Sequence, residues 1–334
     1  MGRIGKIHFR NISQYMPNAA VVAVADPQYN EQAFRKEFGN VFFSQQAEDV
    51  IQRPDVDAVL ICTPTSSHAD LLTLAANAGK HIFCEKPMDL SLERSAVLAD
   101  LVKKSGVRLM LGFNRRFDPD FMQARKNSKE GKIGAIQIVK ITSRDPGLPS
   151  IDYLKNSGGL FMDMAIHDFD MARYMMDKKV TEVFAKGLVL IDEAVSSAND
   201  IDTALTTLTF EDGTYAVIDN SRKAVYGYDQ RLELFGDKGM IQVENNLHNR
   251  NVIYDATGIH QALPLDFFMD RYAASYLKEI ELFVDALANN KPMPVGGEDA
   301  LEATRIAVAA KLSMEEGRPV KLAEITTNVS ELID

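Results

Sequence analysis

Residues 20–27 read Ala-Val-Val-Ala-Val-Ala-Asp-Pro, a short apolar run that ends on an acidic residue and a proline. Such a run is typical of a strand that is buried on both faces of a parallel sheet. A helix is predicted next, over residues 30–38, with Gly39 at its C-terminal end. The further strands predicted up to residue 115 are 57–62, 81–84 and 107–111, and the further helices are 67–78 and 92–104. Alternation of this kind predicts a doubly wound, Rossmann-type α/β domain.

After about residue 120 the pattern changes to alternating apolar and polar residues with turn signals such as Glu211-Asp212-Gly213. This pattern is typical of a mostly antiparallel sheet in an α+β domain. Strands are predicted at 135–142, 182–190, 203–210, 214–218, 231–235 and 240–243, and helices at 272–287 and 300–315. We therefore predict two domains, residues 1–118 and 119–334, with the last helices packing back on the first domain.

The composition excludes several classes of partner. The chain of 334 residues has 37 Lys and Arg against 47 Asp and Glu, a net charge of −10, so neither nucleic acid nor an anionic membrane is expected as a partner. No apolar run approaches the ~18 residues that a membrane span needs. Cys62 and Cys84 both lie in apolar runs, which indicates free thiols and a cytoplasmic protein.

Acidic and small residues at the predicted strand ends indicate a dinucleotide site. Gly2 and Gly5 stand three apart at a predicted helix start, a weak signal alone, with Arg3 and Ile4 between them. Asp26 ends the next strand, where a carboxylate accepts hydrogen bonds from the ribose of NAD and repels the 2′-phosphate of NADP; the alternative is a turn residue before Pro27. The stretch from Thr63 through Pro64 and Ser67 to His68 follows another strand. We predict NAD as the cofactor, with His68 in a capping or packing role.

Several motifs carry a resemblance to a known family. They are residues 2–8 (Gly-Arg-Ile-Gly-Lys-Ile-His), 62–68 (Cys-Thr-Pro-Thr-Ser-Ser-His), 85–87 (Glu-Lys-Pro), 112–119 (Gly-Phe-Asn-Arg-Arg-Phe-Asp-Pro), 142–146, 158–170 and 220–231. Together they resemble the Gfo/Idh/MocA oxidoreductases, and within that family the inositol 2-dehydrogenases. The resemblance covers nearly the whole chain.

The resemblance implies NAD-dependent oxidation of myo-inositol to its 2-keto form. By this resemblance Lys86 bonds the reacting oxygen, His167 is the general base and Asp163 orients it, and the peptide bond before Pro87 is cis. The expected cofactor residues are Gly2, Arg3, Ile4, Asp26, Thr63, Pro64, Ser67, His68, Glu85 and Lys86. The expected substrate residues are Asn114, Arg115, Arg144, Asp163, His167, Asp170 and Tyr226.

Alternatives stay open for these residues and for the substrate. Lys86 could pair with Glu85 on the surface, Asn114, Arg115 and Arg144 could form an ion-pair network, and Tyr226 could be a core tyrosine. Asp163 and His167 also have metal-ligand spacing, but no third ligand is evident and no metal is predicted. The substrate could be scyllo-inositol, glucose or another cyclic polyol, and relatives that bind sugar or dinucleotide without catalysis offer a further alternative.

The start of the sequence lacks a strand that the family pattern includes. The family pattern places an apolar strand and another glycine before Gly2, so we expect a break in the first sheet and a natural chain longer than the sequence given. The alternatives are a fold with a gap that binds NAD weakly and an inactive copy.

The second sheet is expected to leave one face open, with Val183, Leu205, Leu232 and Leu234 on it, as the interface of a homotetramer or homodimer.

Overall fold

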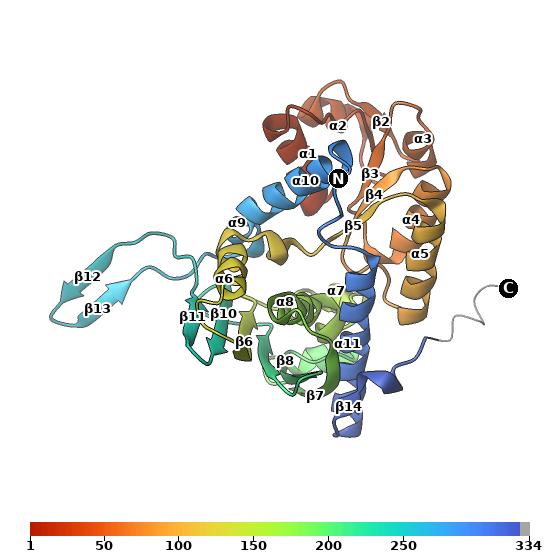
Figure 1. Ribbon diagram of the computed structural model, residues 1–334. Helices are drawn as coiled ribbons and strands as arrows, with labels where there is room; N and C mark the ends of the chain where they lie inside the picture. Colours follow the sequence, from red (N-terminus) through yellow and green to blue (C-terminus); the bar gives the residue numbers. More distant parts are fainter. Residues whose placement is uncertain (328–334) are drawn as a thin grey trace. The chain divides into compact units, whose positions relative to one another are not determined.

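The computed structural model describes residues 1–327, which fall into two compact units (Figure 1). Unit 1 comprises Met1–Asn114 and Tyr276–Glu302, and unit 2 comprises Arg115–Ser275 and Ala303–Thr326. The end of the second predicted domain, residues 328–334, lies outside the described residues. The boundary expected between residues 118 and 119 stays a prediction.

Unit 1 alternates helices and parallel strands. Its elements are α1 (Arg3–Tyr15), β1 (Ala23–Ala25), α2 (Glu31–Phe38), β2 (Phe42–Ser44), α3 (Ala47–Ile51), β3 (Ala58–Ile61), α4 (His68–Asn77), β4 (His81–Glu85), α5 (Leu92–Ser105), β5 (Leu109–Gly112) and most of α10 (Ala273–Ala288). All of the pairings among these strands are parallel, which confirms the predicted Rossmann-type α/β fold.

The parallel strands of unit 1 form two separate sheets, β1-β2 and β3-β4-β5. Within the described part of the chain, β1 pairs with β2 alone, and β3 pairs with β4 alone. This separation agrees with the predicted break in the sheet.

Helix ends in unit 1 follow the signals in the sequence. The side chain of Asn30 accepts a hydrogen bond from the backbone N–H of Ala33 at the start of α2, and Gly39 ends that helix at φ +77°. Ser91 caps α5 in the same way. Strand β4 is buried from Ile82 to Cys84, as expected for a strand covered on both faces.

Unit 2 is built on one large sheet. Its elements are α6 (Pro119–Lys129), β6 (Ile136–Arg144), α7 (Ile151–Asn156), α8 (Ile166–Met176), β7 (Val180–Leu188), β8 (Thr203–Phe210), β9 (Tyr215–Ser221), β10 (Asp229–Gly236), β11 (Gly239–Val243), β12 (Val252–Asp255), β13 (Gly258–Gln261), α9 (Phe268–Arg271), most of α11 (Gly297–Glu316) and β14 (Val320–Lys321). The strand order is β11-β10-β6-β9-β8-β7-β14, and β6–β9 is its parallel pair, the others being antiparallel. The predicted mostly antiparallel sheet is confirmed.

The two faces of this sheet differ from the expectation. Val183, Leu232 and Leu234 are buried, whereas Leu205 is 58% exposed. Three of the four residues predicted on the open face therefore lie on the covered one, because alternation separates two faces but both carry apolar residues here. The other exposed large apolar side chains of these strands are Ile138, Leu188, Tyr215, Phe235 and Met240.

Strands β12 and β13 form a hairpin that extends away from the large sheet of unit 2 (Figure 1). Every residue of both strands is exposed. Without a buried face, the segment shows no alternation of apolar and polar residues from which strands could be predicted.

No helix in residues 1–327 has both the length and the apolar character needed to cross a membrane.

Candidate functional site

In unit 1, predicted cofactor residues and the predicted substrate residue Asn114 lie at or shortly after the C-terminal ends of the parallel strands. Thr63 comes shortly after β3, Glu85 ends β4, and Asn114 comes shortly after β5. Because β3, β4 and β5 are neighbours and parallel, these ends share one edge of the sheet, which is the edge where ligands bind in open α/β sheets. Asn114 is buried, and its side-chain Nδ2 has no hydrogen-bond partner among the described residues. That amide is available to a ligand.

The N-terminus of α1 and Asp26 fit a dinucleotide. Gly2 is the N-cap of α1, and a Cβ placed on it would meet nothing within 4 Å. The N-terminus of a helix favours an anion, because the first-turn N–H groups have no acceptor within the helix. Asp26 follows β1, and its Oδ1 accepts backbone hydrogen bonds from Gln28 (2.8 Å) and Tyr29 (3.0 Å). Its Oδ2 contacts the amino group of Met1, so Asp26 lies at the same end of α1 as Gly2. Helix amides for a pyrophosphate and a carboxylate for a ribose are both present.

His68 joins two of the predicted cofactor segments. Its ring is buried, with Nδ1 2.8 Å from the carbonyl oxygen of Pro87 and Nε2 3.0 Å from the carbonyl oxygen of Thr63. Ser67 donates to the Thr63 hydroxyl at 2.8 Å. The structural role predicted for His68 is confirmed: it holds the loop after β3 against the segment that follows β4.

The Glu85-Lys86-Pro87 segment has the backbone that the resemblance implies. The Lys86–Pro87 peptide bond is cis, as predicted. Glu85 accepts a hydrogen bond from His8 of α1 at 2.9 Å between Oε1 and Nε2. The partner of Glu85 is thus His8, which does not support the alternative of an ion pair between Lys86 and Glu85.

In unit 2, Asp163 and His167 are distinguished by exposure. From Leu160 to Ala172, these two residues keep partial exposure and all the others are buried. Residues Phe161–Ala165 form a π-helical turn before α8 begins at Ile166, a feature that is frequent at functional sites. A ligand that reaches this stretch therefore meets Asp163 and His167.

The carboxylate of Asp163 is held by residues far away in the sequence. Tyr153 donates its hydroxyl to Oδ1 at 2.8 Å, and Arg222 donates to Oδ2 at 3.2 Å. Arg222 is fully buried and also donates to Asp200 at 3.2 Å, while Asp200 accepts the backbone N–H of Leu160 at 2.8 Å. The hydrogen bonds from Tyr153 and the buried guanidinium fix the orientation of the Asp163 carboxyl group.

Asp145 adds a second carboxyl group to this neighbourhood. Burial raises its pKa to about 6; the charges of Asp163 and Asp168 act in the same direction, and those of Arg222 and Arg115 oppose it. A carboxyl group with a pKa this close to neutrality is suited to proton exchange. Sequence reasoning did not include Tyr153 or Arg222 among the site residues.

Two predicted substrate residues lie in buried ion pairs. Arg115 donates to Asp168 at 2.5 Å, and Asn220 donates to the other oxygen of Asp168 at 2.8 Å. Asp170 accepts from Arg116 through both of its oxygens, at 2.7 and 2.5 Å. The structure thus gives Arg115 and Asp170 protein partners within unit 2, which favours the ion-pair alternative for Arg115.

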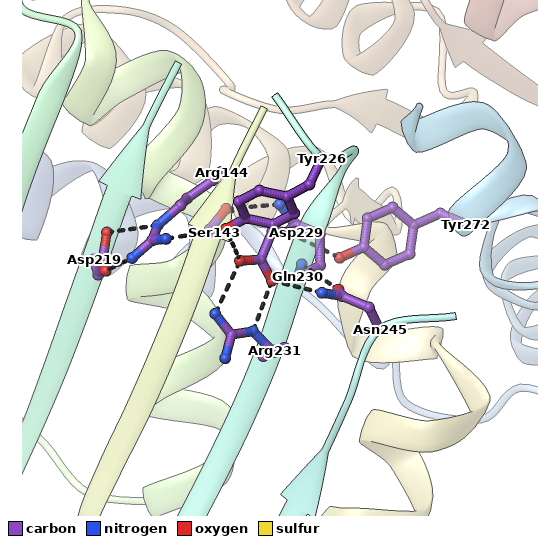
Figure 2. Close-up of polar contacts among 9 residues, drawn as sticks. All are labelled: Ser143, Arg144, Asp219, Tyr226, Asp229, Gln230, Arg231, Asn245 and Tyr272. Atoms are coloured by element: carbon purple, nitrogen blue, oxygen red, sulfur yellow. Dashed lines mark hydrogen bonds and ion pairs between the residues drawn. The ribbon is translucent and has the colours of Figure 1, made fainter. Parts of the chain in front are cut away.

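Arg144 lies beside Asp219 and Tyr226 on the unit 2 sheet (Figure 2). Ser143 and Asn220 point towards Asp168 of α8, so their neighbours Arg144 and Asp219 project from the opposite face. Arg144 pairs with Asp219 and donates to the hydroxyl of Tyr226 at 3.0 Å. These contacts favour the ion-pair alternative for Arg144, and substrate contact by Arg144 or Tyr226 stays a prediction.

Figure 2 shows how that outer network continues to the next strand. Tyr226 donates to Asp229 at 2.6 Å, and Asp229 also accepts from Arg231 and Asn245. These polar groups satisfy one another, which is typical of a structural network.

Comparison with known proteins gives a consistent result. The family description "Oxidoreductase family, NAD-binding Rossmann fold" matches residues 1–113, and "GFO/IDH/MocA C-terminal domain" matches residues 121–242. A myo-inositol 2-dehydrogenase of Thermotoga maritima is 44% identical over 97% of this chain and 97% of its own length.

Two solved structures are similar along their whole length. A probable dehydrogenase from Thermotoga maritima superimposes with a TM-score of 0.95 at 44% identity, covering 97% of this chain and 98% of its own. A scyllo-inositol dehydrogenase from Lactobacillus casei, solved with NAD(H) and scyllo-inositol, gives a TM-score of 0.90 at 32% identity, with 97% of both chains covered.

Proposed function

This chain belongs to the Gfo/Idh/MocA family of oxidoreductases, and on that premise we propose that it oxidises myo-inositol to the 2-keto product with NAD. The observation that carries the proposal is the pair Asp163 and His167, which keep access to solvent in an otherwise buried stretch. The choice of myo-inositol as the substrate is supported by the similarity to the myo-inositol 2-dehydrogenase of Thermotoga maritima.

The proposed chemistry divides among three residues of this chain. His167 takes the proton of the reacting hydroxyl, Asp163 hydrogen-bonds the substrate and orients it, and Lys86 donates a hydrogen bond to the oxygen as charge develops there. NAD, when bound, supplies the hydride acceptor. Gly2, Arg3, Ile4 and Asp26 hold its phosphates and ribose.

Asp163 is suited to this role because its side chain is oriented before substrate arrives. Arg222 and Tyr153 occupy one side of the carboxylate, and their hydrogen bonds prevent it from turning away. A carboxylate that is already oriented loses little entropy when it binds a hydroxyl. We add Asp145 to the proposed substrate residues and leave out Arg115, Arg144, Asp170 and Tyr226, whose polar groups have protein partners.

The polyol itself is tested by a direct assay. The full chain is mixed with NAD and myo-inositol, scyllo-inositol or glucose, and NADH absorbance is followed. We expect the highest kcat/KM with myo-inositol. A higher value with scyllo-inositol would move the assignment to that isomer, the substrate in the Lactobacillus casei complex. No turnover with any cyclic polyol, in a chain that still binds NAD, would refute the dehydrogenase and favour a binding protein.

We also propose that the enzyme is a homotetramer or homodimer that works in the cytoplasm. The exposed side chains of Leu205, Tyr215, Phe235 and Ile138 on the unit 2 sheet support an interface between copies. Cys62 and Cys84 are both free thiols, as expected in a reducing compartment.

A further inference from the structure

Unit 1 contains a compact group of metal-ligating side chains that the proposed reaction does not use. The group consists of His8 on α1, Cys62 directly after β3 and Glu85 at the end of β4, with Glu279 of α10 beside it. One donor atom from each of His8, Cys62 and Glu85 lies within 4.8 Å of the others. Glu279 Oε1 is 3.9 Å from His8 Nε2. Four elements of one unit thus converge on the same point.

Glu279 is the residue that points to a ligand. It is fully buried, and neither carboxylate oxygen has a hydrogen-bond partner among the described residues. His8 is the ionisable side chain within ion-pair distance of it, and His8 is already bonded to Glu85. A buried carboxylate without hydrogen bonds or a counter-charge costs several kcal/mol, so this position requires either a proton or a cation.

The surroundings keep the donor atoms in place. The ring of His8 packs edge-to-face against Phe83 and Tyr276, with centroid distances of 5.2 and 5.9 Å. Gly112 pairs with Glu85 across the sheet, and a Cβ there would come within 2.8 Å of Glu85 Oε2. A glycine at position 112 therefore leaves the space that the Glu85 carboxylate occupies.

We propose that His8, Cys62, Glu85 and Glu279 bind a divalent transition-metal ion of the zinc type. Imidazole, thiolate and carboxylate are the ligands that zinc takes in tetrahedral sites, and a cysteine in the set favours zinc over magnesium or calcium. The ion would replace the His8–Glu85 hydrogen bond and supply the positive charge that Glu279 lacks.

Metal binding at this point would be linked to proton release. Burial raises the pKa of the Glu279 carboxyl and of the Cys62 thiol, and the charge of Glu85 adds to both effects. Both groups are therefore costly to ionise unless a cation is present, and metal binding would release their protons. The site would also fix Glu85, the residue before Lys86, from the side of α1.

The two cysteines of the chain provide a matched pair for the test. Cys84 is a buried free thiol that directly precedes Glu85 in the sequence. It does not belong to the group of donor atoms formed by His8, Cys62 and Glu85. The full chain is stripped with a chelator and titrated with Co²⁺, and the visible and near-ultraviolet absorbance is recorded. Metal content after purification and dialysis against Zn²⁺ is measured by mass spectrometry. These readouts do not depend on dehydrogenase activity.

We expect about one ion per chain, with tetrahedral Co²⁺ bands and a thiolate-to-cobalt charge-transfer band. Cys84→Ser should keep both, whereas Cys62→Ser should lose the charge-transfer band and bind the metal at least ~100-fold more weakly, beyond the range of outer-sphere changes. Glu279→Gln should also weaken binding.

Two results would overturn the proposal. One is that the folded chain binds no stoichiometric metal and that Glu279→Gln is more stable than the unsubstituted protein. This result would mean that Glu279 carries a proton and not a metal ion. The other is metal binding that Cys62→Ser and Cys84→Ser weaken equally. Folding of each variant is checked by circular dichroism before titration.

Discussion

Replacement of Asp145 by asparagine should stabilise the protein at neutral pH and leave it unchanged in acid. Burial raises the pKa of Asp145 to about 6 in the folded protein, against 3.8 for an ordinary aspartate. The folded state therefore binds the proton more tightly than the unfolded chain, and stability that is present below pH 3.8 is lost as the pH rises to 6. The pKa difference corresponds to at most about 3 kcal/mol, because the residue keeps partial exposure.

The measurement is the free energy of unfolding in urea over a series of pH values, taken as the difference between Asp145→Asn and the unsubstituted chain. The difference should be small below pH 3.8, rise through the interval to pH 6 and then stay constant. Asp57→Asn, which changes an exposed aspartate of unit 1, serves as the control and should show no such rise. A difference that is independent of pH, or one that grows as the pH falls, would refute the reasoning about Asp145.

The other predictions concern catalysis, the buried arginine and assembly. Lys86→Ala should lower kcat by ~100-fold or more with NAD affinity retained, measured by NADH absorbance and by NAD titration; unchanged turnover would remove Lys86 from the mechanism. Arg222→Met leaves the carboxylates of Asp163 and Asp200 without their shared cation, so the free energy of unfolding in urea should fall by about 3–5 kcal/mol, and a loss under 1 kcal/mol would contradict the pairing. Leu205→Asp should shift the mass in sedimentation towards the monomer, and an unchanged mass would exclude this face as the interface.

Elements with a regular burial pattern could be predicted from the sequence. Strand β8 has the predicted bounds, Thr203–Phe210, because its buried and exposed residues alternate almost without interruption. The hairpin β12–β13 could not be found in this way, because none of its residues is buried. Strand β1 is shorter than its apolar run suggests, since Ala23–Ala25 alone pair with β2.

The site was predictable where its residues are close in the sequence. The cis bond at Pro87 was implied by the family resemblance, and the structural role of His68 was expected from its place at a helix start. The support of Asp163 did not, because Arg222 is 59 positions away and the sequence gives no signal for a contact over that distance. The face on which Arg144 lies could not be predicted for a different reason. The face of a strand residue depends on the register of the whole sheet, and a single position separates Ser143 from Arg144.

Which face of the unit 2 sheet is covered could not be decided from alternation either. Leu232 and Leu234 alternate with polar residues just as surface-facing apolar residues would, and their burial is settled by the helix packing.

The last strand of unit 2 has a consequence for biosynthesis. Strand β14 pairs Val320 with Val183 of β7, so the outer side of β7 has no partner until the chain has been made almost to its end. On the ribosome, β7 exposes an open strand edge for the time taken to synthesise more than a hundred residues. We therefore expect nascent chains that stop before β14 to be bound by chaperones or to associate through β7. Completion of β14 closes that edge.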